Sequence, residues 1–232
     1  MSQRINCFIP YGDETQTKET ILNLKKDALV GKIYLLNAGE KGRCALEGCE
    51  VVDVPSLKNT EAMKKIAERA DADFTLLYTK ESKLEWVHFA LERMVNIAED
   101  SGAAMIYADH FNVIDGVRSF APVIDYQMGS LRDDFDFGSV LLYRTSAFKE
   151  AVSRMNINYQ FAALYDLRLK VSQKGVLEHM NEYLYYEVEM DTRKSGEKLF
   201  DYVDPKNRAV QIEMEQACTE HLKEIGGFLK PE

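Results

Sequence analysis

The sequence has no long apolar run and only one tryptophan among its 232 residues. A transmembrane helix needs about 20 consecutive apolar residues, so the chain offers no candidate for one. The first residues, Met1 to Ile5, lead directly into an expected strand without an apolar export segment, which makes a cytoplasmic location the default expectation. The hydrophobic content of 46% is sufficient for a large buried core.

Cysteines are few, and the four in the chain form no Cys-x-x-Cys pair. Cys7 lies in an expected apolar strand and Cys218 in an expected helix, so both are interpreted as buried thiols without a disulfide partner. Cys44 and Cys49 lie close together in the sequence and leave a disulfide bridge or a metal site as alternatives.

Positive charge is also scarce, with 29 basic against 38 acidic residues and a net charge of −9. Nonspecific nucleic-acid binding depends on many lysines and arginines that neutralise phosphates, so the charge argues against a nucleic-acid partner. It leaves open a neutral ligand or one bound through a cation.

Apolar strand-like runs alternate with segments of helical periodicity through the first half of the chain. Strands are expected at 5–9, 32–36, 50–54, 74–78 and 104–108, and helices at 19–29, 60–70 and 84–99. This alternation indicates right-handed crossovers and a mostly parallel sheet with helices on both faces. The expected fold class is a doubly wound α/β domain, whose ligands bind beyond the carboxyl ends of the strands.

The second half of the chain does not continue this alternation of strands and helices. Asp115-Gly116 predicts a hairpin turn, and further strands are expected at 138–144 and 175–185. A long amphipathic helix is expected to start at Asp204-Pro205 and to end at Gly226. We therefore predict a single extended domain over residues 1–226, followed by a linker over 227–232 that leads towards a further domain.

Six segments in this order resemble the inverting glycosyltransferases of family 2, namely residues 7–10, 33–39, 70–77, 105–110, 138–146 and 165–172. The resemblance spans nearly the whole chain and rests on the order and spacing of its pieces. It implies the GT-A fold and transfer or binding of a nucleotide-activated sugar in polysaccharide or glycoconjugate synthesis. The partners it implies are the nucleotide-sugar and a glycan acceptor.

The chain departs from the family's pattern at its acidic positions. The family's Asp-x-Asp pair holds a divalent cation, but the strand at 74–78 is followed by Thr79-Lys80-Glu81. We therefore expect no metal ion or other cofactor. The family's general base corresponds to Leu164, which cannot accept a proton, so Asp166 is the remaining catalytic candidate and catalysis is expected to be impaired.

The candidate substrate-binding residues follow the expected strands, and they are Pro10, Tyr11, Asp13, Asn37, Gly39, Lys80, Asp109 and His110. Lys80 either pairs with phosphate in place of a metal or faces solvent. Asp109 and His110 either bind ligand at a strand end or anchor a loop.

For three further groups of residues we favour a structural role over a role in binding or catalysis. The Asp-x-Asp at Asp134 and Asp136 precedes a strand and is read as a solvated acidic loop or helix cap. Alternation along a strand places Tyr183 and Tyr185 on one face, where packing is favoured over stacking on a sugar. Trp86 is expected in the core, on the helix at 84–99.

Three function classes follow from these observations. The first is a glycosyltransferase, and the second is a non-catalytic GT-A scaffold or partner-binding domain beside a second catalytic domain on the same polypeptide. A nucleotidyltransferase is less favoured, because the loop after the first strand lacks a glycine-rich, lysine-containing phosphate motif.

Overall fold

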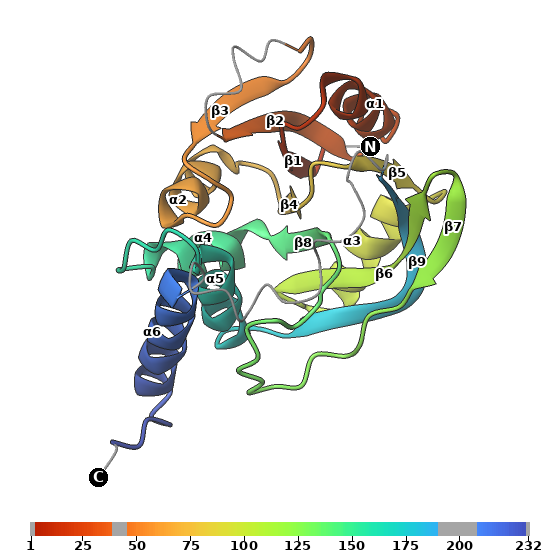
Figure 1. The fold of residues 1–232 in the computed structure, drawn as a ribbon. Helices are drawn as coiled ribbons and strands as arrows, with labels where there is room; N and C mark the ends of the chain where they lie inside the picture. Colours follow the sequence, from red (N-terminus) through yellow and green to blue (C-terminus); the bar gives the residue numbers. More distant parts are fainter. Residues whose placement is uncertain (1–2, 39–45, 190–207, 231–232) are drawn as a thin grey trace.

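The computed structural model describes residues 3–38, 46–189 and 208–230, and its centre is a mixed nine-stranded sheet with helices on both faces (Figure 1). The strand order is β3-β2-β1-β4-β8-β6-β9-β5, and β7 pairs with β6 off this path. The strands are β1 (Ile5–Pro10), β2 (Val30–Ala38), β3 (Glu50–Val54), β4 (Phe74–Tyr78), β5 (Lys83–Trp86), β6 (Met105–Ile114), β7 (Val117–Ala121), β8 (Val140–Arg144) and β9 (Leu177–Glu189). The helices are α1 (Glu14–Leu24), α2 (Thr60–Arg69), α3 (Ala90–Ser101), α4 (Thr145–Ser153), α5 (Ala163–Ser172) and α6 (Arg208–Glu224).

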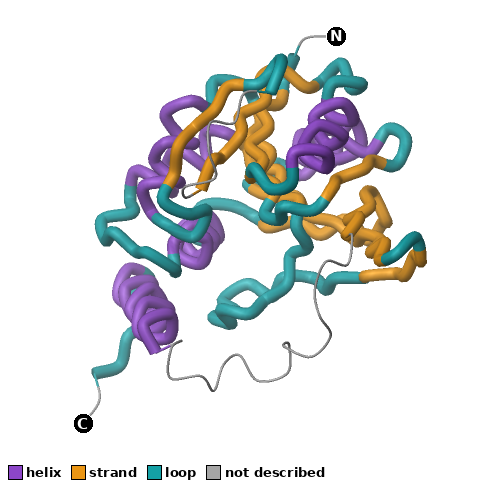
Figure 2. The backbone as a smooth tube through the Cα atoms, turned by 45° about the horizontal axis from the view of Figure 1, so that its top comes forward, coloured by secondary structure: helices purple, strands orange, loops and turns teal. Residues whose placement is uncertain are grey.

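The amino-terminal half is a parallel sheet built from buried strands. β1 pairs in parallel with β2 and β4, and β2 pairs in parallel with β3. Along β1, Cys7 packs in a core shared with α1 and α3, whereas Phe8 packs in a second core with α2, α4 and α5. Side chains of successive strand residues point to opposite faces, so each face has its own helical layer (Figure 2). The expected α/β class, with helices on both faces of the sheet, is confirmed.

Antiparallel strands extend this sheet. β8 runs antiparallel to both β4 and β6, and β6 forms the predicted hairpin with β7. Asp115 and Gly116 have φ angles of 51° and 77°. Positive φ at both central residues is what a two-residue hairpin turn requires, and glycine adopts it without strain.

The prediction of a helix at 84–99 is wrong for its first residues. Lys83–Trp86 form β5, which pairs with β9, and α3 begins only at Ala90. Leu84 is fully buried, its N–H donates to Thr20 Oγ1 (3.0 Å), and its carbonyl accepts from Asn23 Nδ2 (3.3 Å). Two side chains of α1 thus satisfy the outer edge of β5, an interaction that local periodicity does not reveal. Trp86 is accordingly a partly buried strand residue.

Helix boundaries also differ from expectation at α1 and α6. α1 begins at Glu14 because Asp13 Oδ1 accepts hydrogen bonds from the N–H groups of Thr15 and Gln16, each at 3.0 Å. The start of the last helix at Asp204-Pro205 lies outside the described residues. The helix ends as predicted near Gly226, which has a φ of 75°.

The described helices include none that is both long and apolar enough to cross a membrane. Cys7 is buried and Cys218 partly buried, and neither forms a disulfide within the described residues. Cys49 Sγ donates to Leu46 O at 3.0 Å, and Cys44 lies outside the described residues.

Helix α6 is attached to α5 through carboxylates near both of its ends. Glu213 accepts hydrogen bonds from the backbone N–H groups of Gln160 (3.0 Å), Phe161 (2.7 Å) and Ala162 (3.1 Å). These groups precede α5, whose N-cap, Ala162, has no side chain able to accept a hydrogen bond. Near the other end, Glu224 pairs with Lys170 Nζ at 2.9 Å. A residue distant in sequence therefore caps α5.

We predict that Glu213→Ala lowers the free energy of unfolding by about 1–2 kcal/mol, because three backbone donors and the positive end of the α5 dipole lose their carboxylate. Urea denaturation followed by circular dichroism measures this change. The control is Glu215→Ala on the exposed face of the same helix, which should change stability by less than about 0.5 kcal/mol. Equal losses in the two variants would contradict the capping role.

Candidate functional site

The loops after β1 and β4 lie against each other at the carboxyl edge of the sheet. Tyr11 N donates to Leu36 O at 3.0 Å, which extends the pairing of β1 with β2 beyond Pro10. A Cβ added to Gly12 would lie 2.7 Å from Glu81 Cβ, so only glycine allows this approach. The structure thus brings the loop of Tyr11 next to the loop of Lys80, as the parallel arrangement predicts.

Two other predicted residues at this edge have structural partners. Asn37 Nδ2 donates to Asp53 Oδ1 at 2.8 Å, while its buried Oδ1 has no hydrogen-bond partner among the described residues. Asp13 caps α1, as shown above, and Gly39 lies outside the described residues. Sequence reasoning missed Asp53, although its place at the end of a neighbouring strand could have indicated it.

An ion pair between Lys80 and Glu187 lies at the end of β4, where the sequence has no Asp-x-Asp pair. The Glu187 side chain is 1% exposed and belongs to β9, whereas that of Lys80 is 44% exposed and follows β4. Sequence reasoning missed Glu187. An acidic residue directly after the apolar run 183–186 is the signal that marks it, because a buried carboxylate needs a partner.

His110 adjoins this ion pair. Its Nε2 lies 3.3 Å from Glu187 Oε1, and its ring stacks on Tyr185 with centroids 5.1 Å apart. Burial lowers the pKa of His110, although the charge of Glu187 opposes that shift. The neutral imidazole is favoured, so Lys80 supplies the positive charge that compensates Glu187.

Asp109 belongs to a separate cluster. Its Oδ1 accepts from Val123 N at 2.9 Å and lies 3.0 Å from His179 Nε2, and His179 Nδ1 lies 2.7 Å from Asp125 Oδ1. The expectation that Asp109 and His110 stand at a strand end is wrong, because pairing with β7 and β9 continues β6 to Ile114. The two residues have different partners and do not form one site.

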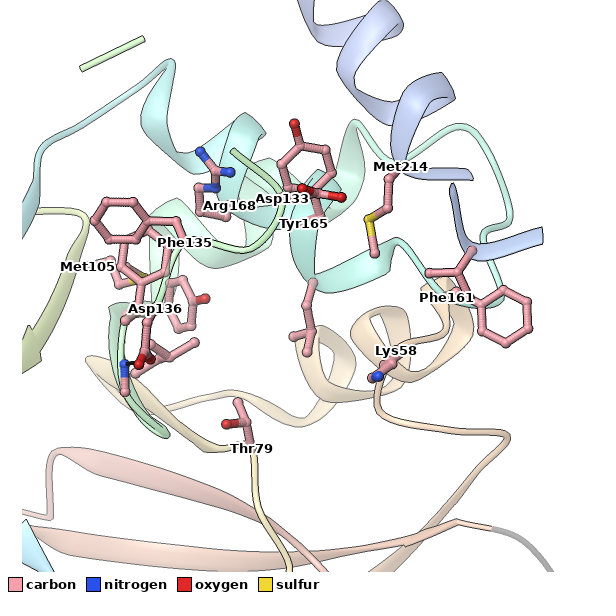
Figure 3. Close-up of a pocket in the computed structure, with 16 residues that line it drawn as sticks. Lys58, Thr79, Met105, Asp133, Phe135, Asp136, Phe161, Tyr165, Arg168 and Met214 are labelled. Atoms are coloured by element: carbon pink, nitrogen blue, oxygen red, sulfur yellow. Dashed lines mark hydrogen bonds between the residues drawn. The ribbon is translucent and has the colours of Figure 1, made fainter. Parts of the chain in front are cut away.

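A cavity of about 330 Å³ opens beside Thr79 (Figure 3). One wall comes from the segment between β7 and β8, and the other from α5 and α6. Figure 3 shows Arg168 and Tyr165 near Asp133, with Thr79 on the opposite side of the cavity. The remaining lining residues are Lys58, Met105, Phe135, Asp136, Phe137, Gly138, Leu141, Tyr143, Phe161, Leu164, Val210 and Met214.

Leu164 and Asp166 face different cavities although both lie in the first turn of α5. Leu164 lines the larger cavity together with Thr79. Asp166 lines a separate cavity of about 40 Å³ and pairs with Lys170 Nζ at 3.3 Å. Residues two apart on a helix point about 200° apart, which explains the separation. Burial raises the pKa of Asp166, against the opposing charge of Lys170.

The acidic segment before β8 has the structural role expected of it. Asp134 pairs with Arg132 at 3.0 Å, and Asp136 Oδ1 accepts from Gly138 N at 2.8 Å. Residues 3–38, 46–189 and 208–230 contain no group of three histidine, cysteine, aspartate or glutamate side chains placed to hold a metal ion.

The tyrosines of β9 pack as predicted, but on different faces from those predicted. The register shifts at Ala108/Asp109 and again at Asp109/His110. Such a bulge breaks the alternation of side chains. Tyr183 and Tyr186 consequently both stack on Phe111, with centroids 4.9 and 4.8 Å away, while Tyr185 OH accepts from Ser139 N at 2.9 Å.

We predict that Lys80→Met lowers the free energy of unfolding by about 1–3 kcal/mol, because it leaves the buried Glu187 carboxylate without its cation. The double variant Lys80→Met/Glu187→Gln should recover part of the loss, and a double-mutant cycle in urea measures the coupling. The control is Lys18→Met, which breaks an exposed pair with Glu14 and should leave the free energy of unfolding unchanged within error. Absence of coupling between residues 80 and 187 would contradict the pairing.

No protein-family model matches the sequence, and neither does any curated protein. Solved structures do match, among them S. aureus TarS 1-349 in complex with UDP-GlcNAc, with a TM-score of 0.59 and 12% identity over 97% of this chain and 73% of that chain. A second structure of TarS 1-349 has a TM-score of 0.55 and 11% identity over 80% of this chain. The chain spans 60% of that structure and 37% of a longer TarS structure. At this identity the likeness establishes the fold alone, which is that of a GT-A-like glycosyltransferase.

Proposed function

We propose that this chain is a glycosyltransferase-type domain that binds a nucleotide-activated sugar without a divalent cation. The fold supports this proposal, since the matching TarS structures include complexes with UDP-GlcNAc and with UDP. Open α/β sheets bind their ligands at the carboxyl edge, where Pro10, Tyr11, Asn37 and Lys80 lie. Fold alone does not assign an activity, so the proposal depends on the chemistry at that edge.

The ion pair of Lys80 with Glu187 is the observation that carries the proposal. A divalent cation prefers carboxylate oxygens, and the residues after β4 supply a hydroxyl from Thr79, an ammonium from Lys80 and a single carboxylate from Glu81. An ammonium repels a metal ion, so this donor set does not fit one. A half-exposed ammonium held by a buried carboxylate instead offers positive charge to the oxygens of a diphosphate.

The cavity is lined by Thr79, which precedes Lys80 in the sequence, and we assign it to the sugar and the glycan acceptor. Transfer needs a general base that takes the proton from the attacking hydroxyl group of the glycan. Leu164 lines the cavity at that position, and Asp166 faces a different cavity. Binding without efficient transfer is the consequence. The second candidate function, a non-catalytic scaffold for a further transferase domain beyond residues 1–226, is favoured by the same observation.

We expect the domain to bind UDP-GlcNAc and UDP with equal affinity in EDTA and in Mn²⁺, measured by titration calorimetry. Lys80→Met should weaken binding of both ligands about ten- to a hundredfold, since a charge-assisted hydrogen bond contributes about 1.5–3 kcal/mol. The control is Lys149→Met, which should leave both affinities unchanged. Lys149 lies beside Arg144 and Thr145, near the opposite edge of the sheet. A requirement for Mn²⁺, or unchanged affinity in Lys80→Met, would refute the proposal.

Turnover should be close to background across a panel of UDP and GDP sugars and glycan acceptors, because general-base catalysis typically contributes about 10²- to 10⁴-fold. Release of nucleoside diphosphate, measured in a coupled assay, gives the rate. Asp166→Asn should not change that rate. Robust activity that Asp166→Asn abolishes would show that Asp166 is the base and that catalysis is intact.

A further inference from the structure

The wall of the cavity opposite α5 is a long segment without regular structure. It joins β7 to β8 across residues 122–139 (Figure 1, green trace) and contributes Asp133, Phe135 and Phe137 to the lining. Irregular segments of this length are uncommon in compact domains unless they serve binding or another function. Such a segment keeps one conformation only if other parts of the protein hold its backbone.

The first part of this segment is held from β6. Tyr107 OH donates to Ile124 O at 2.9 Å and accepts from Tyr126 N at 2.7 Å. Asp109, as shown above, accepts from Val123 N. These hydrogen bonds fix residues 123–126. Tyr107 and Tyr126 also contact the lining residue Phe137, with ring centroids 4.9 and 5.8 Å away, but bind no backbone group of the lining residues.

Arg168 holds the second part. Its guanidinium donates to Ser130 O at 2.7 Å and to Arg132 O at 2.5 Å, and Tyr165 OH donates to Leu131 O at 2.5 Å. The Arg168 guanidinium also lies 4.9 Å from the centre of the Tyr165 ring. Three consecutive carbonyl groups are thus bound by two side chains of α5, immediately before the lining residues.

The charge of Arg168 is unusual for its position. The residue is 5% exposed, and among the described residues its guanidinium forms no ion pair with a carboxylate. Burial of an unpaired guanidinium is costly, and here carbonyl oxygens and aromatic faces compensate for it only in part. A methionine would fill similar space without that cost, so the directed hydrogen bonds of the guanidinium explain its presence better than packing does.

The wall that Arg168 positions combines aromatic rings with carboxylates. Phe135 and Phe137 have ring centroids 4.4 Å apart, and Asp133 and Asp136 line the same cavity. Aromatic faces contact the C–H surfaces of a sugar ring, and carboxylates accept hydrogen bonds from hydroxyl groups. This chemistry suits a neutral hexose.

We infer that Arg168 is a positioning residue, which holds the wall at 130–137 in the conformation that recognises the sugar of the nucleotide-sugar, and this inference rests on the proposed function. Arg168 is one of the residues that line the cavity, and its guanidinium is engaged by the carbonyl groups of Ser130 and Arg132. It acts through the backbone of residues 130–132, so its loss should affect the sugar and leave the nucleotide unaffected.

The test compares the affinities of UDP-GlcNAc, UDP-glucose and UDP for wild type, Arg168→Met and Arg168→Lys by titration calorimetry. Arg168→Met should weaken binding of both sugar nucleotides about tenfold and leave UDP unchanged. Arg168→Lys keeps the charge but loses the planar fork, so an intermediate loss is expected. The control is Arg154→Met, which removes an arginine from the separate cavity beside Asp166 and should change no affinity.

Four outcomes would overturn the inference. If Arg168→Met weakens the binding of UDP and of the sugar nucleotides equally, Arg168 contributes only to general stability. If the affinities are unchanged, Arg168 has no part in recognising the sugar. If Arg168→Met does not fold, the same comparison is made with Arg168→Lys, and a uniform effect of that variant refutes the inference. Wild type that binds neither UDP nor the sugar nucleotides would refute the proposed function itself, together with the ligand assigned to the cavity.

Discussion

The interaction on which the candidate site depends is the contact between the ammonium of Lys80 and the buried carboxylate of Glu187. It connects the loop after β4 to β9, and so joins the parallel half of the sheet to the part that is largely antiparallel. Without this cation the buried charge of Glu187 would have no positive partner, because burial favours the neutral form of the adjacent His110 ring. One ion pair therefore sets both the charge and the geometry of the carboxyl edge.

Much of the fold follows from local sequence patterns. The buried strands, the hairpin at Asp115-Gly116 and the end of α6 were predictable, because apolar periodicity and glycine positions reflect local conformational preferences. β5 was not predictable, because its edge is satisfied by Thr20 and Asn23 of a distant helix. The bulge in the pairing of β6 with β9 was not predictable either, since the register of β9 depends on how it pairs with β6 and not on the sequence of β9 alone.

Site residues were predictable where their location depended only on their position at the end of a strand. Lys80 and Tyr11 lie in adjacent loops, because the carboxyl ends of parallel neighbouring strands meet at one edge. Asp109 was assigned to that edge incorrectly, since nothing local shows that β6 continues past Ala108. Glu187 was missed because its partner is more than one hundred positions away in the sequence, and Arg168 because its role is to bind backbone carbonyls, which no motif records.

The capping of α5 by Glu213 has a consequence for the order in which the protein assembles. The backbone donors at residues 160–162 are synthesised before the carboxylate that satisfies them, and α6 also supplies Val210 and Met214 to the cavity. Domains begin to fold from the amino terminus during synthesis. The sheet can therefore form while the cavity is still open on one side. The cavity is closed on that side only once α6 has been synthesised and has packed against α5.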